Sequence, residues 1–172
     1  MSLCYLCGAM SCYKGTNEYE EKAVAWRYEI RKELSATKMN VFDPTNVDYE
    51  GLDWNDQCVV ELNFSKLDKA ACLIVNVENI EKSPGSLIEI ALAFERDIPI
   101  IWFGKLTTHS PHVRRMLGFN QYNTLKEALK AVKIIFELED DYYSYEDYAA
   151  YMDEVSEEGW ERYLEQADDY YC

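Results

Sequence analysis

The 172-residue chain lacks an apolar run long enough to cross a membrane, which takes about 20 consecutive residues. Its apolar opening, Met1–Met10, is much shorter and contains no basic residue, so it does not have the pattern of a targeting segment. Because 48% of the residues are apolar, the chain can form one domain with a substantial core. We therefore expect a soluble, cytoplasmic protein that does not bind membranes.

Basic residues are scarce, with 17 Lys and Arg against 32 Asp and Glu, a net charge of −15. Residues 137–172 hold 14 acidic residues and a single basic one, Arg162, whereas the first 136 residues are nearly balanced at −2. A nucleic-acid-binding protein needs an excess of basic surface to displace counterions from the phosphates. Neither part of the chain supplies that excess, so we expect no nucleic acid partner.

Potential metal ligands are few and scattered. Cys4 and Cys7 form a C-x-x-C inside an expected strand, where odd spacing sends the two side chains to opposite faces. The two histidines, His109 and His112, flank Pro111 in a turn-like stretch with no second cluster to complete a ligand set, so we interpret them as surface loop residues. We expect no metal and no cofactor. The six cysteines are expected to be reduced, because disulfide scaffolds belong to small secreted chains.

Residues 1–136 alternate between short apolar runs and helical patterns, which is typical of an α/β fold with a doubly wound, mostly parallel sheet. The expected class is a five-stranded flavodoxin-like or Rossmann-like domain over 1–136. The expected strands are Leu3–Cys7, Asn40–Phe42, Cys72–Val77, Ile98–Phe103 and a short one near Phe119–Tyr122. The expected helices are Ala23–Leu34, Val59–Leu67, Gly85–Arg96 and Leu125–Ile135, the last opened by a capping box of Thr124 and Glu127.

Acidic residues and tyrosines dominate the chain from Glu137 onward, with eight of the 14 tyrosines in residues 137–172. Ser144 can cap a helix on which Tyr148 and Tyr151 share a face. We expect an acidic helical tail that docks its aromatic face on the domain or on a sister subunit. A disordered or partner-binding tail is the alternative.

The residues that follow the strands are the candidates for chemistry, because open parallel sheets bind ligands at the carboxyl ends of their strands. Gly8, Ala9 and Met10 follow the first strand, Asp43 the second, and Asn76 ends the third. We expect substrate contacts from Gly8, Ala9, Met10 and Asn76. The long loop Asn46–Asp56 is expected to cover the site.

Glu89 is the strongest single candidate. It lies in the stretch Ser83-Pro84-Gly85-Ser86-Leu87-Ile88-Glu89, where we expect Gly85 to provide a tight turn and Ser86 to cap a helix. Glu89 would then fall in the first helical turn, where the helix dipole keeps a carboxylate ionised and able to attack an electrophilic carbon. The alternative is a first-turn acid that only complements the dipole.

Four segments, taken in order, resemble the nucleoside 2-deoxyribosyltransferase family. Tyr5-Leu6-Cys7-Gly8-Ala9 resembles its Y-L-A-G-P signature, Trp26-Arg27 its W-R, Phe42-Asp43-Pro44 its D-P, and Gly85-Ser86-x-x-Glu89 its G-T-x-x-E. The resemblance implies a homo-oligomeric salvage enzyme that cleaves the N-glycosidic bond of deoxynucleosides. It also implies that Glu89 is the nucleophile of a covalent glycosyl intermediate, which a second free base or water then collects.

Two positions depart from this family. Asn63 stands where the family has an aspartate that protonates the base, so Asn63 can only hydrogen-bond it, and Asp43 or Glu61 is left as a candidate acid. Ser83 stands where the transferases tend to have aspartate; it resembles the related deoxynucleoside 5′-monophosphate N-glycosidases, in which serine holds the phosphate. A plain turn residue at position 83, and a nucleotide-binding protein without turnover, remain alternatives.

Further contacts are expected around the base and the phosphate. Tyr5, Met10 and Trp26 could form an apolar wall for the base, although Trp26 also suits a core position. Arg27 is expected to pair with an acid or a phosphate. Gly85 and Ser86 are expected to contact the substrate at the start of the helix that carries Glu89.

Overall fold

The computed structural model describes residues 2–47 and 56–138. The expected acidic helix with Ser144, Tyr148 and Tyr151 lies outside these residues, and so does most of the expected covering loop Asn46–Asp56. The chain divides into two compact units, Met1–Leu129 and Lys130–Cys172. The predicted domain boundary at residue 136 stays a prediction.

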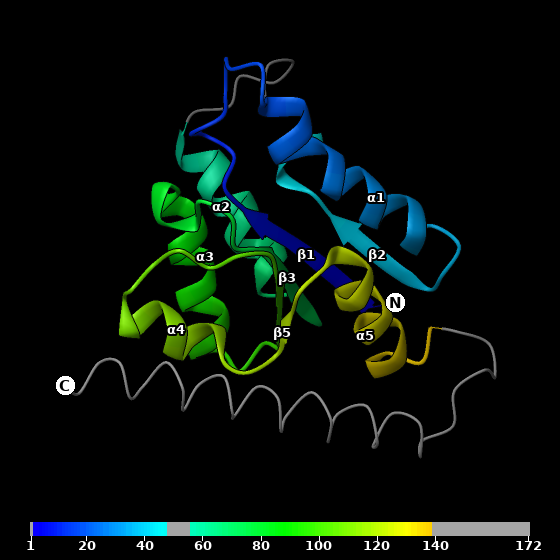
Figure 1. Cartoon of the computed structure of the whole chain (residues 1–172). Coiled ribbons are helices and arrows are strands. Elements are labelled where there is room, and N and C mark those ends of the chain that lie inside the picture. The colour runs from blue at the N-terminus through cyan, green and yellow to red at the C-terminus, as the bar shows by residue number, and fades with distance from the viewer. Residues whose placement is uncertain (1, 48–55, 139–172) are drawn as a thin grey trace. The chain divides into compact units, whose positions relative to one another are not determined.

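The described strands form one parallel sheet in the order β2-β1-β3-β4-β5 (Figure 1). Every residue of β3 and β4 is buried, as their apolar sequences predict. The predicted doubly wound sheet is confirmed. Its fourth strand is shorter than the predicted Ile98–Phe103, because it begins at Ile100 and leaves out Ile98 and Pro99. The strands are β1 (Ser2–Gly8), β2 (Met39–Phe42), β3 (Cys72–Asn76), β4 (Ile100–Phe103) and β5 (Gln121–Tyr122).

The described helices follow the strands in the expected alternation. They are η1 (Tyr19–Val24, a π-helix), α1 (Ala25–Leu34), η2 (Pro44–Asn46), α2 (Asp56–Leu67), η3 (Ile80–Lys82), α3 (Pro84–Glu95), α4 (Pro111–Leu117) and α5 (Leu125–Ile135). The capping box that opens α5 is confirmed. The backbone N–H of Glu127 donates to Thr124 Oγ1 at 3.2 Å, and the backbone N–H of Thr124 donates to Glu127 Oε2 at 3.1 Å.

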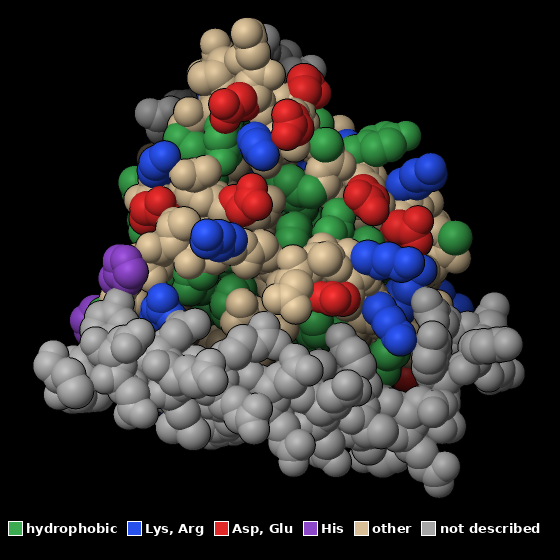
Figure 2. Space-filling model, in the orientation of Figure 1, with side chains coloured by type: hydrophobic (Ala, Val, Ile, Leu, Met, Phe, Trp, Pro, Cys, Tyr) green, Lys and Arg blue, Asp and Glu red, His purple; other side chains and the backbone are tan. Residues whose placement is uncertain are grey.

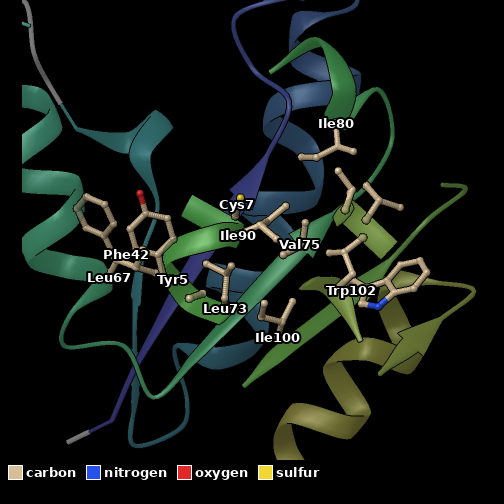
Figure 3. Packing of buried hydrophobic residues seen from close by; sticks show 14 residues of the cluster. Tyr5, Cys7, Phe42, Leu67, Leu73, Val75, Ile80, Ile90, Ile100 and Trp102 are labelled. Atoms are coloured by element: carbon tan, nitrogen blue, oxygen red, sulfur yellow. The ribbon is translucent and has the colours of Figure 1, made fainter. Parts of the chain in front are cut away.

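Helices α2, α3 and α4 cover one face of the sheet and α1 covers the other (Figure 1). Tyr5 and Phe42 lie at one end of the core between the sheet and α2–α4, with Leu67 beside Phe42 (Figure 3). Side chains alternate along a strand, so Gly8 at the end of β1 faces the α1 side, whereas Tyr5 and Cys7 face α3. The β1 strand therefore contributes to both faces near its carboxyl end.

Helix α4 was missed by the sequence analysis, which placed His112 in a loop. His112 is an exposed residue of this helix. Pro111 occupies the first helical turn, where its missing N–H costs nothing, and Val113 and Leu117 are buried one turn apart. The Ser110-Pro111 pair therefore starts a helix. The same pair is also typical of a turn, which is what the sequence analysis predicted.

The face shown in Figure 2 carries acidic and basic side chains interspersed with one another, in keeping with the near balance of charge in the first 136 residues. Within the described ranges, no helix has the length and apolar character needed to cross a bilayer.

Candidate active site at the carboxyl ends of β1 and β3

The strand order places a topological switch point between β1 and β3. The connection after β1 leads to β2 on one side, and the connection after β2 crosses back to β3 on the other. Gly8 and Asn76 end these two strands and are paired across them. Doubly wound folds bind ligands at this location, so the switch point defines where the candidate site lies.

Gly8 joins the two sides of the sheet. Its carbonyl oxygen accepts a hydrogen bond from Arg27 Nη2 of α1 and another from Ser86 Oγ of α3, each at 3.0 Å. A Cβ atom on this residue would lie 3.0 Å from Trp26 Cζ2 and 3.1 Å from the carbonyl oxygen of Asn76. Glycine is therefore required by packing at the switch point, whether or not it also contacts a substrate.

Glu89 lies in the second turn of α3, because the helix begins at Pro84. The side chain is half-buried and faces β1, where the Tyr5 hydroxyl donates a hydrogen bond of 2.7 Å to Glu89 Oε1. Tyr5 is itself held by Phe42, with ring centroids 5.2 Å apart. The nucleophile candidate is thus bound directly to the strand that ends at the switch point.

Burial is the largest influence on the pKa of the Glu89 carboxyl group. Desolvation raises the pKa of its carboxyl group, and hydrogen bonds from Tyr5 and Cys7 and the charge of Arg27 lower this pKa only in part. The expectation of a first-turn carboxylate stabilised by the dipole is wrong, because α3 begins at Pro84, three residues before Leu87, where a helix capped by Ser86 would begin.

Cys7 is a neighbour of Glu89 that the sequence analysis did not single out. Burial and the charge of Glu89 raise the pKa of its thiol well above the ordinary value, so the thiol keeps its proton. Cys7 Sγ lies 3.6 Å from the carbonyl oxygen of Ser86, to which it donates. Its place two residues after Tyr5, on the same face of β1, is the signal that could have identified it.

Ser83 and Ser86 are buried and bonded to each other, with 2.9 Å between their hydroxyl oxygens. Since Ser86 uses its single proton on Gly8, Ser83 must donate to Ser86. Ser86 therefore does not cap α3, contrary to the expectation, and anchors the helix to β1 instead. Gly85 lies within α3 and is not among the described glycines with positive φ, so the expected tight turn at Gly85 is also wrong.

Arg27 was expected to pair with an acid or with a phosphate, and in the structure it pairs with an acid, Asp43. Its Nε lies 3.5 Å from Asp43 Oδ1, and its Nη1 donates to the carbonyl oxygen of Ala23. Arg31 Nε lies 3.4 Å from Asp43 Oδ2, and the hydroxyl of Thr45 donates to Asp43 Oδ1 at 2.7 Å. Asp43 is thus held by two arginines and by η2, and Arg27 ties both ends of the loop after β1 together.

The expected apolar wall of Tyr5 and Trp26 does not form, because the two rings lie on opposite faces of the sheet. Trp26 packs edge-on against Phe103, with ring centroids 5.6 Å apart, so the core reading of this residue is confirmed. Met10 packs with Ala9 in a small separate cluster of the loop after β1.

Asn76 keeps a free donor at the switch point. Its Oδ1 accepts from the backbone N–H of Glu78 at 3.0 Å, which fixes the side chain, while Nδ2 has no partner in the described residues. Asn76 is therefore available to a ligand hydroxyl or carbonyl.

The α2 residues lie on two different faces. Asn63 is half-buried one turn before the buried Leu67, so it faces the sheet, whereas Glu61 is exposed and accepts from Gln57 Nε2 at 2.7 Å. Glu61 therefore faces away from the sheet, which does not favour it as the candidate acid.

A second contact missed by sequence joins the loops after β1 and β3. Asn79 Nδ2 donates to the Tyr13 hydroxyl at 2.6 Å, and Asn79 adopts a left-handed conformation with φ 54°. Asparagine tolerates the left-handed conformation better than most residues do. This preference for a turn is the only local feature of the sequence that points to Asn79. In the described residues no group of three or more His, Cys, Asp and Glu side chains could hold a metal ion.

The class defined by these features is a doubly wound α/β protein with a half-buried glutamate beside its switch point. Among solved structures, a conserved protein from Enterococcus faecalis V583 is similar at a TM-score of 0.61 and 11% identity, over 78% of this chain and 99% of that one. A 2-deoxyribosyltransferase from Bacillus psychrosaccharolyticus, described as a biocatalyst for nucleoside synthesis, is similar at a TM-score of 0.57 and 11% identity, over 74% of this chain and 90% of that one.

No family model and no curated protein sequence matches the chain. The structural likeness confirms the fold that the resemblance to the nucleoside 2-deoxyribosyltransferase family implied.

Proposed function

We propose that the protein cleaves the N-glycosidic bond of 2′-deoxynucleosides and transfers the sugar to a second base or to water, with Glu89 as the nucleophile. The observation that carries the proposal is the 2.7 Å hydrogen bond from Tyr5 to a half-buried Glu89 beside the switch point. The fold shared with a 2-deoxyribosyltransferase supports it. The proposed setting is nucleoside salvage in the cytoplasm by a homo-oligomer.

The proposed reaction has two steps at the anomeric carbon. Glu89 Oε attacks C1′ as the C1′–N bond breaks, and the base leaves with the bonding electrons. The resulting glycosyl ester is then attacked at C1′ by a second base or by water, which regenerates the carboxylate. Tyr5 orients the carboxylate, and its partial desolvation makes it more basic and hence a better nucleophile than an exposed glutamate.

The other predicted site residues take supporting roles in this proposal. Asp43 holds Arg27 and, through it, the end of β1, so we propose Asp43 as a positioning residue rather than as the acid. Asn76 contributes its free amide donor to the sugar or the base. Ser83 and Ser86 fix the start of α3 against Gly8.

The test is to incubate the protein with each 2′-deoxynucleoside and each 5′-monophosphate, with and without a free acceptor base, and to follow base release by chromatography. Base release only from the monophosphates would identify the 5′-monophosphate N-glycosidase alternative. Base exchange would identify transfer, and release without exchange would identify hydrolysis. No turnover of any substrate would refute the enzyme proposal, and equilibrium dialysis with the same compounds would then test the nucleotide-binding alternative.

Glu89→Gln tests the nucleophile. We expect a loss of activity on the order of 10³-fold or more, because an amide cannot form the glycosyl ester. Glu95→Gln is the matched control, since Glu95 is an exposed residue of the same helix. A glycosyl adduct on Glu89, detected by mass spectrometry after acid quenching, would support the covalent step. An unchanged rate in Glu89→Gln would rule out the assignment.

A further inference from the structure

Among residues 2–47 and 56–138, the proton donors that act on Glu89 are weak acids. Tyr5 presents a phenol at 2.7 Å, and Cys7 presents a thiol whose pKa is raised well above its ordinary value. The charged group that acts on Glu89 is Arg27, whose guanidinium does not release its proton in proteins. Over residues 2–47 and 56–138, no second carboxyl group influences the pKa of Glu89.

Helix α2 adds an amide to this set. Asn63 lies one turn before Leu67, which packs in the same cluster as Tyr5 and Phe42, and α2 contacts α3. Since α2 connects two parallel strands, it runs opposite to them, and its earlier turns lie nearer the carboxyl ends of the strands. Asn63 is therefore the residue that α2 presents toward the site from the turn above Leu67. Its amide can donate a hydrogen bond but cannot transfer a proton.

The donor set determines which bases can leave easily. A neutral purine or pyrimidine departs as an anion unless an acid protonates it, and a well-placed acid contributes roughly 10²- to 10⁴-fold to the rate. The acid of a retaining glycosidase stands about 5 Å from the nucleophile, close enough to affect its ionisation. A base that already carries a positive charge departs as a neutral molecule and needs no proton.

We infer that the preferred substrates are N-glycosides of cationic heterocycles, such as pyridinium nucleosides or purine nucleosides alkylated at N7. This inference rests on the proposed function of Glu89. Glu89 Oε forms a bond to C1′ while the C1′–N bond breaks, and the electron pair of that bond neutralises the ring nitrogen. Water then attacks C1′, the ester bond breaks, the sugar is released, and the proton of the water passes to solvent.

The test compares two substrates that differ in charge but hardly in shape. The kcat/KM for 7-methyl-2′-deoxyguanosine and for 2′-deoxyguanosine is measured at one pH, with the Glu89→Gln variant supplying the background of spontaneous hydrolysis. We expect a ratio of about 10²-fold or more in favour of the methylated nucleoside, which is the lower end of what a well-placed acid contributes to the departure of a neutral base. The 2-deoxyribosyl nucleoside of nicotinamide, run in parallel, distinguishes a pyridinium preference from an alkylpurine preference.

The Asn63→Asp variant gives an independent measurement. A carboxyl group at this position would supply the proton for a neutral base, so the ratio should fall by about tenfold or more. Ser65→Asp, which adds the same charge at an exposed position of α2, is the matched control and should leave the ratio unchanged.

The outcomes separate the inference from the proposed function. If wild type releases guanine from 2′-deoxyguanosine within about threefold of the rate for the methylated substrate, the inference is overturned while the function of Glu89 stands. If neither cationic nor neutral nucleosides show turnover above the Glu89→Gln background, the proposed function fails and the inference fails with it. A folded Asn63→Asp variant with an unchanged ratio would overturn the placement of Asn63 at the leaving base.

Discussion

Two acidic side chains lie near the carboxyl end of β1, on opposite sides of the sheet, and they are held in different ways. Asp43 is paired with Arg27 and Arg31 and bonded to Thr45, so its charge is compensated by two cations. Glu89 accepts a hydrogen bond from the phenol of Tyr5, and burial raises the pKa of its carboxyl group. Both sides meet at the carbonyl oxygen of Gly8, which accepts from Arg27 and from Ser86.

The difference separates a structural acid from a reactive one. Removing one partner of a buried ion pair leaves the other charge uncompensated, which destabilises the fold. A desolvated carboxylate without a direct cation is less stable than in water, which favours reactions that consume its charge, such as attack on an anomeric carbon. Substitutions on the two sides should therefore separate stability from activity.

The largest expected effect on stability comes from Asp43→Asn. Two arginines, one of them fully buried, would lose their anion, so the free energy of unfolding should fall by about 3 kcal/mol. Glu89→Gln should not lower stability at neutral pH, since burial disfavours the ionised carboxylate. Urea denaturation of both variants at one pH measures the contrast, and equal losses would show that the two acids are not held differently.

The next effect is expected at Gly8, where the two sides meet. In Gly8→Ala the new methyl group would meet the Trp26 ring at 3.0 Å and the backbone oxygen of Asn76 at 3.1 Å, and the backbone atom cannot move aside cheaply. We expect a loss of about 2 kcal/mol in the free energy of unfolding.

Gly85→Ala is the matched control, because nothing lies within 4 Å of the new methyl group and the residue is helical. A gain of about 0.5 kcal/mol is expected there. Thermal unfolding of the pair gives the comparison, and a Gly8→Ala variant as stable as wild type would contradict the close packing at the switch point.

Local sequence signals predicted the sheet but not the start of α3. The apolar runs in β3 and β4 and the Thr124–Glu127 capping box act within a few residues, so each was visible in the sequence. The segment Ser83-Pro84-Gly85-Ser86 offers two serines as possible helix caps, and local chemistry does not choose between them. The bond from Ser86 to Gly8, 78 residues away, fixes the choice and moves Glu89 into the second turn.

The interaction partners of several polar and charged residues could not be predicted from local sequence either. The pairing of Arg27 with Asp43 depends on α1 packing beside β2, and the hydrogen bond from Asn79 to Tyr13 joins two loops 66 residues apart in sequence. The resemblance in order and spacing brought out Glu89, Tyr5 and Gly8, which the structure places together. It said nothing of Cys7, where the family signature has alanine.

Tyr5→Phe sharpens the comparison on the Glu89 side through its pH dependence. The groups that lower the pKa of Glu89 are Tyr5 and Cys7 from β1 and, through its charge from the other side of the sheet, Arg27 from α1. The Tyr5 hydrogen bond favours the ionised form, so its loss should raise the pKa of Glu89 further. Because the nucleophile must be ionised, activity falls as pH drops through this pKa, and the acid limb of kcat/KM should move to higher pH.

At neutral pH we expect about a tenfold loss in Tyr5→Phe that shrinks as the pH rises. Tyr28→Phe, at an exposed position of α1, is the control. A loss in Tyr5→Phe that is the same at every pH would mean that Tyr5 acts on the substrate and not on Glu89.

Protonation of Glu89 should also link pH to stability. Since its pKa is raised in the folded chain, the stability that the protonated form contributes is complete below the unfolded pKa and is lost as pH rises through the folded pKa. Activity is gained over the same interval. The fall in stability and the gain in activity with rising pH should both disappear in Glu89→Gln. Urea titrations of the variant and of wild type at several pH values would measure the change in stability.

The smallest effects are expected at the serine pair, and they decide what that pair is for. Ser86→Ala removes the bond to Gly8 and the acceptor of Ser83, so the free energy of unfolding should fall by about 1 kcal/mol, and Ser83→Ala should cost about half of that. If the pair serves only to anchor α3, then Ser83→Ala should leave the KM ratio between a deoxynucleoside and its 5′-monophosphate unchanged. A selective rise in KM for the monophosphate would instead make Ser83 a phosphate ligand, and the α3 side of the switch point would then bind the substrate through its hydroxyls as well as through Glu89.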